Sequence, residues 1–401
     1  MPLVGRLDRV AGFLVMLLPL LFLLGRAVAD VALILVAVAF LARSAASRDV
    51  AWIWEPWVLV GLAWVGWLTF GGLFAADVAS ATGKAAVQIR FVLFAAALAT
   101  VHFRNTAVRA NFLLALSSAV VLVAIDCVIQ AATGTSLTGR GLPELYRLSG
   151  PFDSQKAGTY LAKTIFPTLL PLMLIMGDRR RAAWVVLLAL AVAGMIIALT
   201  GERSALLTFG LGTLVCLLLL PRLRSFLLPV VLLATLGAGV LVLSRPILVE
   251  RFVGHTEDDL TNFADKRYGM ILRSGLALAA DQPITGIGVA EFPKRCPSPE
   301  LAVIGPVDVR CVSHPHNPWM EMLVEGGVVG LALWLAMVGL WLKRFAAAGR
   351  PVLVVGLATL LPFSWPLMTS MSLFTTWNAI LWWQAVGLLL ALSPRREELR
   401  R

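Results

Sequence analysis

The sequence predicts an all-α protein that crosses a membrane many times, and three observations support this. First, 59% of the 401 residues are hydrophobic and only 14% are charged, whereas a soluble domain carries about a quarter charged residues. Second, the apolar residues form long continuous runs instead of alternating with polar ones, which excludes a closed β-barrel. Third, four cysteines in a chain of this length do not make a disulfide-rich scaffold.

Twelve apolar runs are long enough, or nearly so, to cross a bilayer, which needs about 20 residues per helix. The first two are short, and Gly25 lies between them, so we expect a tight hairpin there. No cleavable leader is expected, because the chain continues from Gly25 directly into the second run. The runs cover residues 11–25, 27–42, 57–74, 84–101, 111–130, 157–176, 182–199, 204–220, 225–243, 317–341, 351–370 and 374–392.

The basic residues predict the orientation. Arg and Lys gather at both ends of the chain and in every second short connection, and the positive-inside rule keeps such segments in the cytoplasm. Two longer segments, 131–156 and 244–316, then face outward. We divide the chain into residues 1–243 with nine spans, the outer loop 244–316, and residues 317–401 with three spans and a basic cytoplasmic tail.

The outer loop 244–316 is expected to contain structure of its own, because structureless loops of this length are uncommon. Residues 267–280 show a helical apolar pattern, which predicts an amphipathic helix lying against the outer leaflet. Cys296 and Cys311 both fall in this loop. An oxidising outer compartment favours a disulfide between them over two free thiols.

The strongest local motif is Ser313-His314-Pro315-His316-Asn317-Pro318. Asn is a preferred N-cap and Pro a preferred first helical residue, so a helix is expected to start at Pro318. His316 then lies just outside a membrane helix, where the positive end of the helix dipole disfavours a charged imidazole. A neutral imidazole is suited to act as a general base, whereas a structural histidine would only hydrogen-bond the loop. We favour His316 as the base, with His314 as the weaker candidate.

Cationic residues gather near the outer starts of several spans. Free N–H groups at such starts favour an anion, and Arg is suited to hold phosphate through paired hydrogen bonds. An Arg at a helix end often only snorkels to the interface, but Arg90 lies inside the fourth span, where a charge is costly. We therefore predict a cationic outer pocket for a lipid-linked phosphate or pyrophosphate. Its candidate residues are Lys84, Arg90, Arg147, Lys156, Arg203, Arg267 and Arg273.

Metal, nucleotide and nucleic-acid chemistry are not expected. The acidic run Glu257-Asp258-Asp259 lacks a ligand pattern beyond His255, and no Gly-rich phosphate loop occurs. The chain is therefore expected to need no cofactor and to use a substrate that arrives already activated.

The order of several motifs carries a family resemblance. Gly201-Glu202-Arg203-Ser204 precedes the long outer loop with its Arg-containing helix; Gly286-Ile287-Gly288, His316-Asn317 and Glu325-Gly326-Gly327 follow. This order resembles the O-antigen ligase/polymerase superfamily of bacterial surface-polysaccharide enzymes. The chain length and the single large outer loop look most like the ligase branch.

The resemblance implies an inverting, metal-independent glycosyltransferase of the Gram-negative inner membrane. It would move O-antigen polysaccharide from undecaprenyl pyrophosphate to lipid A–core oligosaccharide in the periplasmic leaflet, the final step of lipopolysaccharide assembly. His316 would deprotonate the acceptor hydroxyl, while Arg147 and Arg203 would hold the pyrophosphate. Arg267 falls where the family carries an outer-loop Arg, and Arg273 is its neighbour.

Two other functions remain open from the sequence. An O-antigen polymerase would share the fold, the donor and the cationic pocket, but its acceptor would be another lipid-linked repeat. A transporter of polyprenyl-linked sugars would use the pocket for binding only. Internal repeats would favour a transporter, and the two halves of the chain show no convincing repeat.

Overall fold

The computed structural model describes residues 2–142, 147–176, 179–226, 246–367 and 369–394, together with 229–230, 232, 236–237, 239–240 and 243. Within these residues the protein is helical, and the only β-bridge joins Thr135 to Gly141. Eight of the described helices are long and apolar enough to cross a membrane. The prediction of an all-α, multi-pass membrane protein is confirmed.

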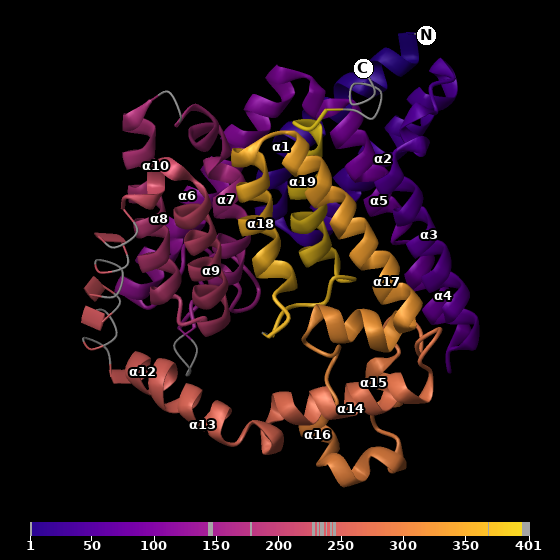
Figure 1. Ribbon diagram of the computed structural model, residues 1–401, viewed down its shortest axis with the longest axis vertical. Helices are drawn as coiled ribbons and strands as arrows, with labels where there is room; N and C mark the ends of the chain where they lie inside the picture. Colours follow the sequence, from indigo (N-terminus) through magenta and orange to yellow (C-terminus); the bar gives the residue numbers. More distant parts are fainter. Residues whose placement is uncertain are drawn as a thin grey trace.

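The N-terminal helices form one flank of the bundle (Figure 1). α1 (Pro2–Leu24) and α2 (Arg26–Ser47) pack against each other. Gly25 between them has a φ of 147°, which residues with a side chain rarely adopt. The predicted hairpin around Gly25 is confirmed, and α3 (Pro56–Gly71) follows after a short 3-10 turn.

The fourth predicted span starts earlier than expected and is interrupted. It consists of α4 (Val78–Ala86) and α5 (Ile89–Thr100), which belong to one apolar stretch from Val78 to Arg104. Asp77 caps α4, because its side chain accepts a hydrogen bond from the Ser80 N–H at 3.0 Å. The interruption after Ala86 means that Lys84 and Arg90 do not share one continuous helix.

The other flank contains the helices that will form the candidate site (Figure 1). Its members are α6 (Thr106–Thr133), α7 (Ala157–Ile175), α8 (Arg180–Leu199) and α9 (Arg203–Leu219), followed by the short α10 (Pro221–Arg224). α7 packs against α6, α8 and α9 and lies inside this group. The predicted span at 225–243 is described only in part, and the basic tail at 395–401 lies outside the described residues.

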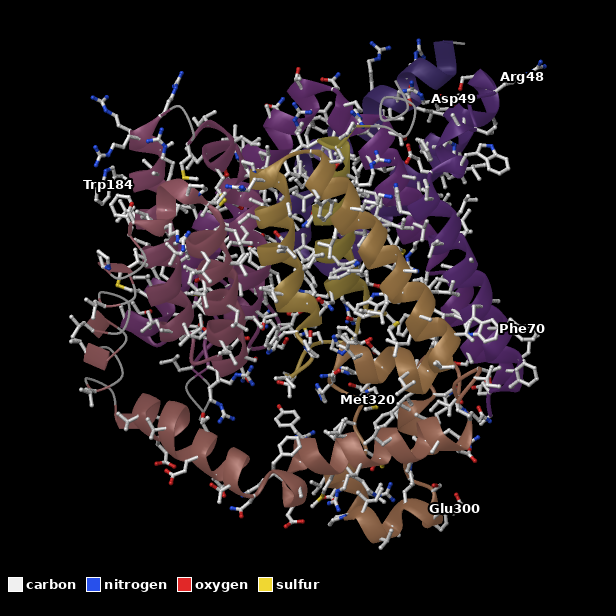
Figure 2. All side chains as sticks on the ribbon, in the orientation of Figure 1. Arg48, Asp49, Phe70, Trp184, Glu300 and Met320 are labelled. Carbon is white, nitrogen blue, oxygen red and sulfur yellow. A yellow bond between two sulfur atoms is a disulfide. The ribbon has the colours of Figure 1, made fainter. Side chains whose placement is uncertain are left out.

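The outer loop folds into short helices at the end of the bundle that lies away from the start of α1 and the end of α19 (Figure 1). They are α12 (Pro246–Val249), α13 (His255–Thr261), α14 (Arg267–Asp281), α15 (Phe292–Arg295) and α16 (Val307–Arg310). α14 confirms the predicted helix. Its apolar residues Ile271 and Leu278 pack with Met320 in a small core, so protein rather than the outer leaflet covers this face (Figure 2).

α17 (Pro318–Ala347), α18 (Arg350–Ser364) and α19 (Thr376–Ala391) complete the bundle. α17 bends sharply at Gly327, which has a φ of 67° (Figure 1). A Cβ at Gly327 would lie 2.0 Å from the Ile284 carbonyl oxygen, and one at Gly286 would lie 2.5 Å from the Gly327 nitrogen. The two glycine motifs therefore allow two backbone segments to touch, and this contact joins the outer helices to the membrane bundle.

Candidate functional site

A cavity of about 300 Å³ lies beside the ends of α7 and α9 that face the outer helices. Its wall combines three parts of the chain that are far apart in sequence. α7 and its N-cap contribute Lys156, Thr159 and Lys163, and the segments before α9 and α17 contribute Glu202 and His316. Arg147 and Tyr268 also line it.

The start of α17 places His316. The Asn317 side chain accepts hydrogen bonds from the N–H groups of Trp319 and Met320 at 3.0 and 3.1 Å, which confirms the predicted helix start. His316 itself has a φ of 55°, an uncommon value for a residue with a side chain. Its carbonyl oxygen accepts a hydrogen bond from the Ser370 N–H at 2.6 Å. This backbone geometry holds the imidazole at the cavity wall.

The two neighbouring histidines have different surroundings. Nδ1 of the His314 ring lies 2.9 Å from the Ser313 hydroxyl oxygen, and Nε2 lies 3.2 Å from the Ser370 carbonyl oxygen. Both ring nitrogens therefore already have a hydrogen-bond partner in the protein. The His316 ring lies 4.2 Å from the His314 ring, between centroids, and lines the cavity. Of these two histidines, His316 is the one whose side chain lines the cavity.

The His316 imidazole is neutral at pH 7. Burial is the largest cause of a lowered pKa, and the nearby His314 and Arg267 add to it, so that the pKa of His316 falls to about 4. Burial also lowers the pKa of His314. The sequence attributed a neutral ring to the helix dipole, whereas the structure shows that removal from water is the main cause.

Glu202 connects three parts of the site, and the sequence analysis did not identify it as a candidate. Its buried carboxylate accepts hydrogen bonds from the Gly158 N–H at 2.7 Å and from the Thr159 hydroxyl at 2.5 Å, at the first turn of α7. It also lies 3.8 Å from a guanidinium nitrogen of Arg147. Glu202 therefore caps α7 and orients Arg147 at the same time.

Gln130 holds the loop that carries Arg147. This fully buried side chain of α6 accepts hydrogen bonds from the N–H groups of Ser149 and Gly150 at 3.1 and 3.0 Å. Leu148 donates its N–H to the Thr200 carbonyl oxygen at 3.1 Å, which ties the same loop to the turn before α9. The position of Arg147 thus depends on contacts with two helices.

Two lysines of α7 lie along the cavity wall. Lys156 is half-buried, and its ammonium lies 5.6 Å from the centroid of the Trp377 ring. Burial and, to a smaller extent, the charge of Arg26 lower the pKa of Lys156. Lys163 lies two turns further along α7 and is 2% exposed. Sequence analysis missed Lys163 because it is a single charge inside an apolar run.

The other predicted cations lie outside the lining of this cavity. Arg203 donates a hydrogen bond to the Thr256 hydroxyl at 3.0 Å, while its neighbours Glu202 and Ser204 line the cavity. Arg267 is close enough to His316 to lower its pKa. Arg273 donates to the Ala264 carbonyl oxygen at 2.7 Å, which directs it into the outer helices.

Lys84 and Arg90 require a correction, because the structure does not bring them to the cavity. Arg90 pairs with Asp30 of α2 at 3.1 Å and donates to the Val87 carbonyl oxygen at 2.7 Å. Lys84 is exposed at the end of α4. The expected grouping of cations from several outer helix starts therefore fails for the fourth span, since α4 packs against α3 rather than against α7.

The predicted disulfide between Cys296 and Cys311 is present, with a Cα–Cα distance of 5.5 Å. The Arg310 side chain is buried beside it and donates hydrogen bonds to the carbonyl oxygens of Gly305, at 2.9 Å, and Cys296. The chain runs from this bridge to His316 in five residues. Among the described residues, no three His, Cys, Asp or Glu side chains group closely enough to hold a metal ion.

The comparisons with known proteins agree with the motifs. No curated protein matches this chain. Residues 185–335 match the family model Wzy_C, described as O-Antigen ligase. The matched segment begins in α8 and ends in α17, so it includes the start of α9, the outer helices and His316. This match supports the O-antigen ligase superfamily and a glycosyltransferase role of the ligase or polymerase type.

Proposed function

We propose that this protein is an O-antigen ligase, an inverting glycosyltransferase that moves O-antigen polysaccharide from undecaprenyl pyrophosphate to lipid A–core oligosaccharide. One observation carries the proposal: a single cavity brings the neutral imidazole of His316 together with Arg147 and Lys156. A base and an anion-binding group at one site are what transfer from a sugar pyrophosphate requires.

The proposed reaction is a single displacement. The acceptor hydroxyl of the core oligosaccharide lies against His316, and a ring nitrogen of His316 takes its proton as the oxygen attacks C1 of the donor sugar. The bond between C1 and the pyrophosphate oxygen breaks, and its electron pair stays on that oxygen. Attack from the opposite face inverts the configuration at C1, and undecaprenyl pyrophosphate leaves.

The cations act on the leaving group. Arg147 and Lys156 balance the negative charge that grows on the pyrophosphate as the C1–O bond breaks. Glu202 keeps the Arg147 guanidinium at the cavity wall from a distance of 3.8 Å. In this proposal fixed side chains supply the positive charge without a metal ion, and Arg203 and Arg267 add to the field from just outside the lining.

The proposed location is the bacterial inner membrane, with the cavity facing the periplasm. The outer helices lie at the end of the bundle away from the start of α1 and the end of α19 (Figure 1). The cavity lies beside the ends of α7 and α9 that face these helices. Basic residues in the intervening loops favour placing both termini in the cytoplasm. A disulfide in the outer loop also fits an oxidising compartment.

The test uses purified protein in nanodiscs with lipid-linked polysaccharide as donor, in the presence or absence of lipid A–core. We expect undecaprenyl pyrophosphate to be released only when lipid A–core is present. Release with the donor alone would instead identify a polymerase. Binding of the donor without release under either condition would favour a transporter, and either result would contradict the ligase.

A further inference from the structure

Lys163 is a buried charge that the proposed transfer does not yet use. Its ammonium donates a hydrogen bond to the Asn378 side-chain oxygen at 2.5 Å and lies 4.4 Å from the centroid of the Phe363 ring. Neither partner carries a negative charge. In the described part of the chain, no carboxylate lies within 4 Å of this nitrogen. Among the described residues, Lys163 therefore has no carboxylate in direct contact, and Glu202 acts on it only from further away across the cavity.

Such an arrangement is unfavourable unless a ligand completes it. A buried ion without an opposite charge is strongly destabilising, and an ionisable residue inside a membrane span usually has a function. An ammonium has three donors, and Asn378 is the one described acceptor within hydrogen-bond distance. Lys163 also lines the same cavity as Arg147, Lys156 and His316. Its remaining donors can therefore reach an anion in that cavity.

The ammonium is held in place from two other helices. Asn378 of α19 donates hydrogen bonds from its amide nitrogen to the carbonyl oxygens of Met371 and Ser372, both at 3.1 Å. These bonds fix the direction of its side-chain oxygen toward Lys163. Phe363 of α18 presents its ring to the same ammonium. Because both of these groups are uncharged, Lys163 is held in place without a direct ion pair, so an anionic ligand can pair with its ammonium.

The depth of Lys163 indicates which part of the donor it meets. Lys156 and Lys163 are seven residues apart on α7, which corresponds to about 10 Å along a helix. The polyprenyl chain of the donor stays in the bilayer, whereas its sugar must reach His316 in the outer segment. The phosphate next to the lipid therefore lies deeper than the phosphate next to the sugar.

We propose that Lys163 binds the phosphate attached to the polyprenyl chain, while Arg147 holds the phosphate attached to the sugar. This assignment rests on the proposed function. It gives the two phosphates of one pyrophosphate two separate cationic partners, at different depths of one cavity. A polyprenyl monophosphate then keeps its contact with Lys163 and lacks the group that Arg147 binds.

The experiment measures binding of undecaprenyl phosphate and undecaprenyl pyrophosphate to the full-length protein in nanodiscs. The variants are Lys163→Met, Arg147→Gln and, as a matched control, Lys343→Met, which removes an exposed lysine near the other end of α17. We expect Lys163→Met to weaken binding of both lipids about tenfold or more, as for a lost charge-assisted hydrogen bond. Arg147→Gln should weaken only the pyrophosphate, and Lys343→Met neither.

Several outcomes would overturn the assignment. Equal binding of both lipids by Lys163→Met and the wild type would show that Lys163 makes no phosphate contact. Equal weakening of both lipids by Arg147→Gln would contradict the separate partners. If the wild type binds neither lipid, the proposed function itself fails, which is a distinguishable result.

Thermal unfolding separates binding from folding. Removing a buried charge that lacks a counter-charge should leave the melting temperature of Lys163→Met unchanged or higher. If this variant does not fold, Lys163→Gln replaces it, because an amide can still donate a hydrogen bond to Asn378. If both variants fail to fold, Lys163 has a structural role and the assignment is wrong.

Discussion

The α4 side and the α7 side of the bundle both carry cations, but only one of them forms a cavity site. On the α4 side, Lys294 of α15 contacts the carboxylates of Asp77 and Glu291 at 2.9 and 2.6 Å, and Arg90 pairs with Asp30 at 3.1 Å. On the α7 side, Arg147 and Lys156 line a cavity together with His316. The two sides differ in how closely carboxylates pair with their cations: carboxylates lie within 3.1 Å of Lys294 and Arg90, whereas the Glu202 carboxylate lies 3.8 Å from Arg147.

Glu202 shows how a carboxylate on the α7 side can pair with a cation and still leave it donors for a ligand. Its carboxylate accepts hydrogen bonds from the Gly158 N–H and the Thr159 hydroxyl in the first turn of α7. One carboxylate oxygen lies 3.8 Å from a guanidinium nitrogen of Arg147. The cations therefore keep donors for a ligand. A basic residue near a helix start is thus not sufficient evidence for an anion site.

The largest effect is expected for His316→Gln. This change keeps the size and hydrogen-bonding capacity of the side chain but removes the base, so transfer should fall about 100-fold or more. The measurement is the initial rate of undecaprenyl pyrophosphate release in the presence of lipid A–core.

His314→Gln is the matched control for His316→Gln. Both nitrogens of the His314 ring contact protein groups, the Ser313 hydroxyl and the Ser370 carbonyl oxygen, so its replacement should reduce the rate much less. If the His314 variant proved the more damaging of the two while both were folded, the assignment of the base would be wrong.

A smaller effect is expected for Glu202→Ala. The variant loses the cap of α7 and the group that orients Arg147, so KM for the donor should rise about tenfold, the size expected for a lost charged hydrogen bond. kcat should change less, because Glu202 acts through Arg147 rather than on the reacting atoms.

Glu202→Gln tests whether this role is positional. An amide oxygen can still accept from the Gly158 N–H, so this variant should recover part of the KM loss. A defect confined to kcat, with KM unchanged in both variants, would be incompatible with a positioning role.

Local motifs made part of this structure predictable. Continuous apolar runs predicted the membrane helices. Asn317 followed by Pro318 predicted the start of α17, because helix capping involves residues that are neighbours in the sequence. The pairing of Arg90 with Asp30 was not predictable, since it depends on the packing of α2 against α5. Glu202 was missed for the same reason, because its partners belong to α7 and to the loop that contains Arg147.

The pH dependence should be weak over most of the accessible range. A base works in its neutral form, and His316 has a lowered pKa of about 4, so its neutral fraction is nearly complete above pH 5 and is lost as the pH falls through 4. The rate should then fall about tenfold for each further pH unit. Initial rates between pH 3.5 and 8 in nanodiscs measure this, and an ordinary histidine would already lower the rate about 30-fold at pH 5.

The smallest effect is expected for Lys84→Met, compared with Lys156→Met. Both lysines were predicted at outer helix starts, but Lys84 is exposed at the end of α4, whereas Lys156 lies directly before the first residue of α7 and lines the cavity. Lys84→Met should change KM for the donor by less than about twofold, as is usual for an exposed charge, whereas the loss of Lys156 should raise it several-fold. Equal effects of the two variants would mean that net positive charge, rather than the geometry at α7, attracts the donor, and the contrast between the two sides of the bundle would then carry no functional meaning.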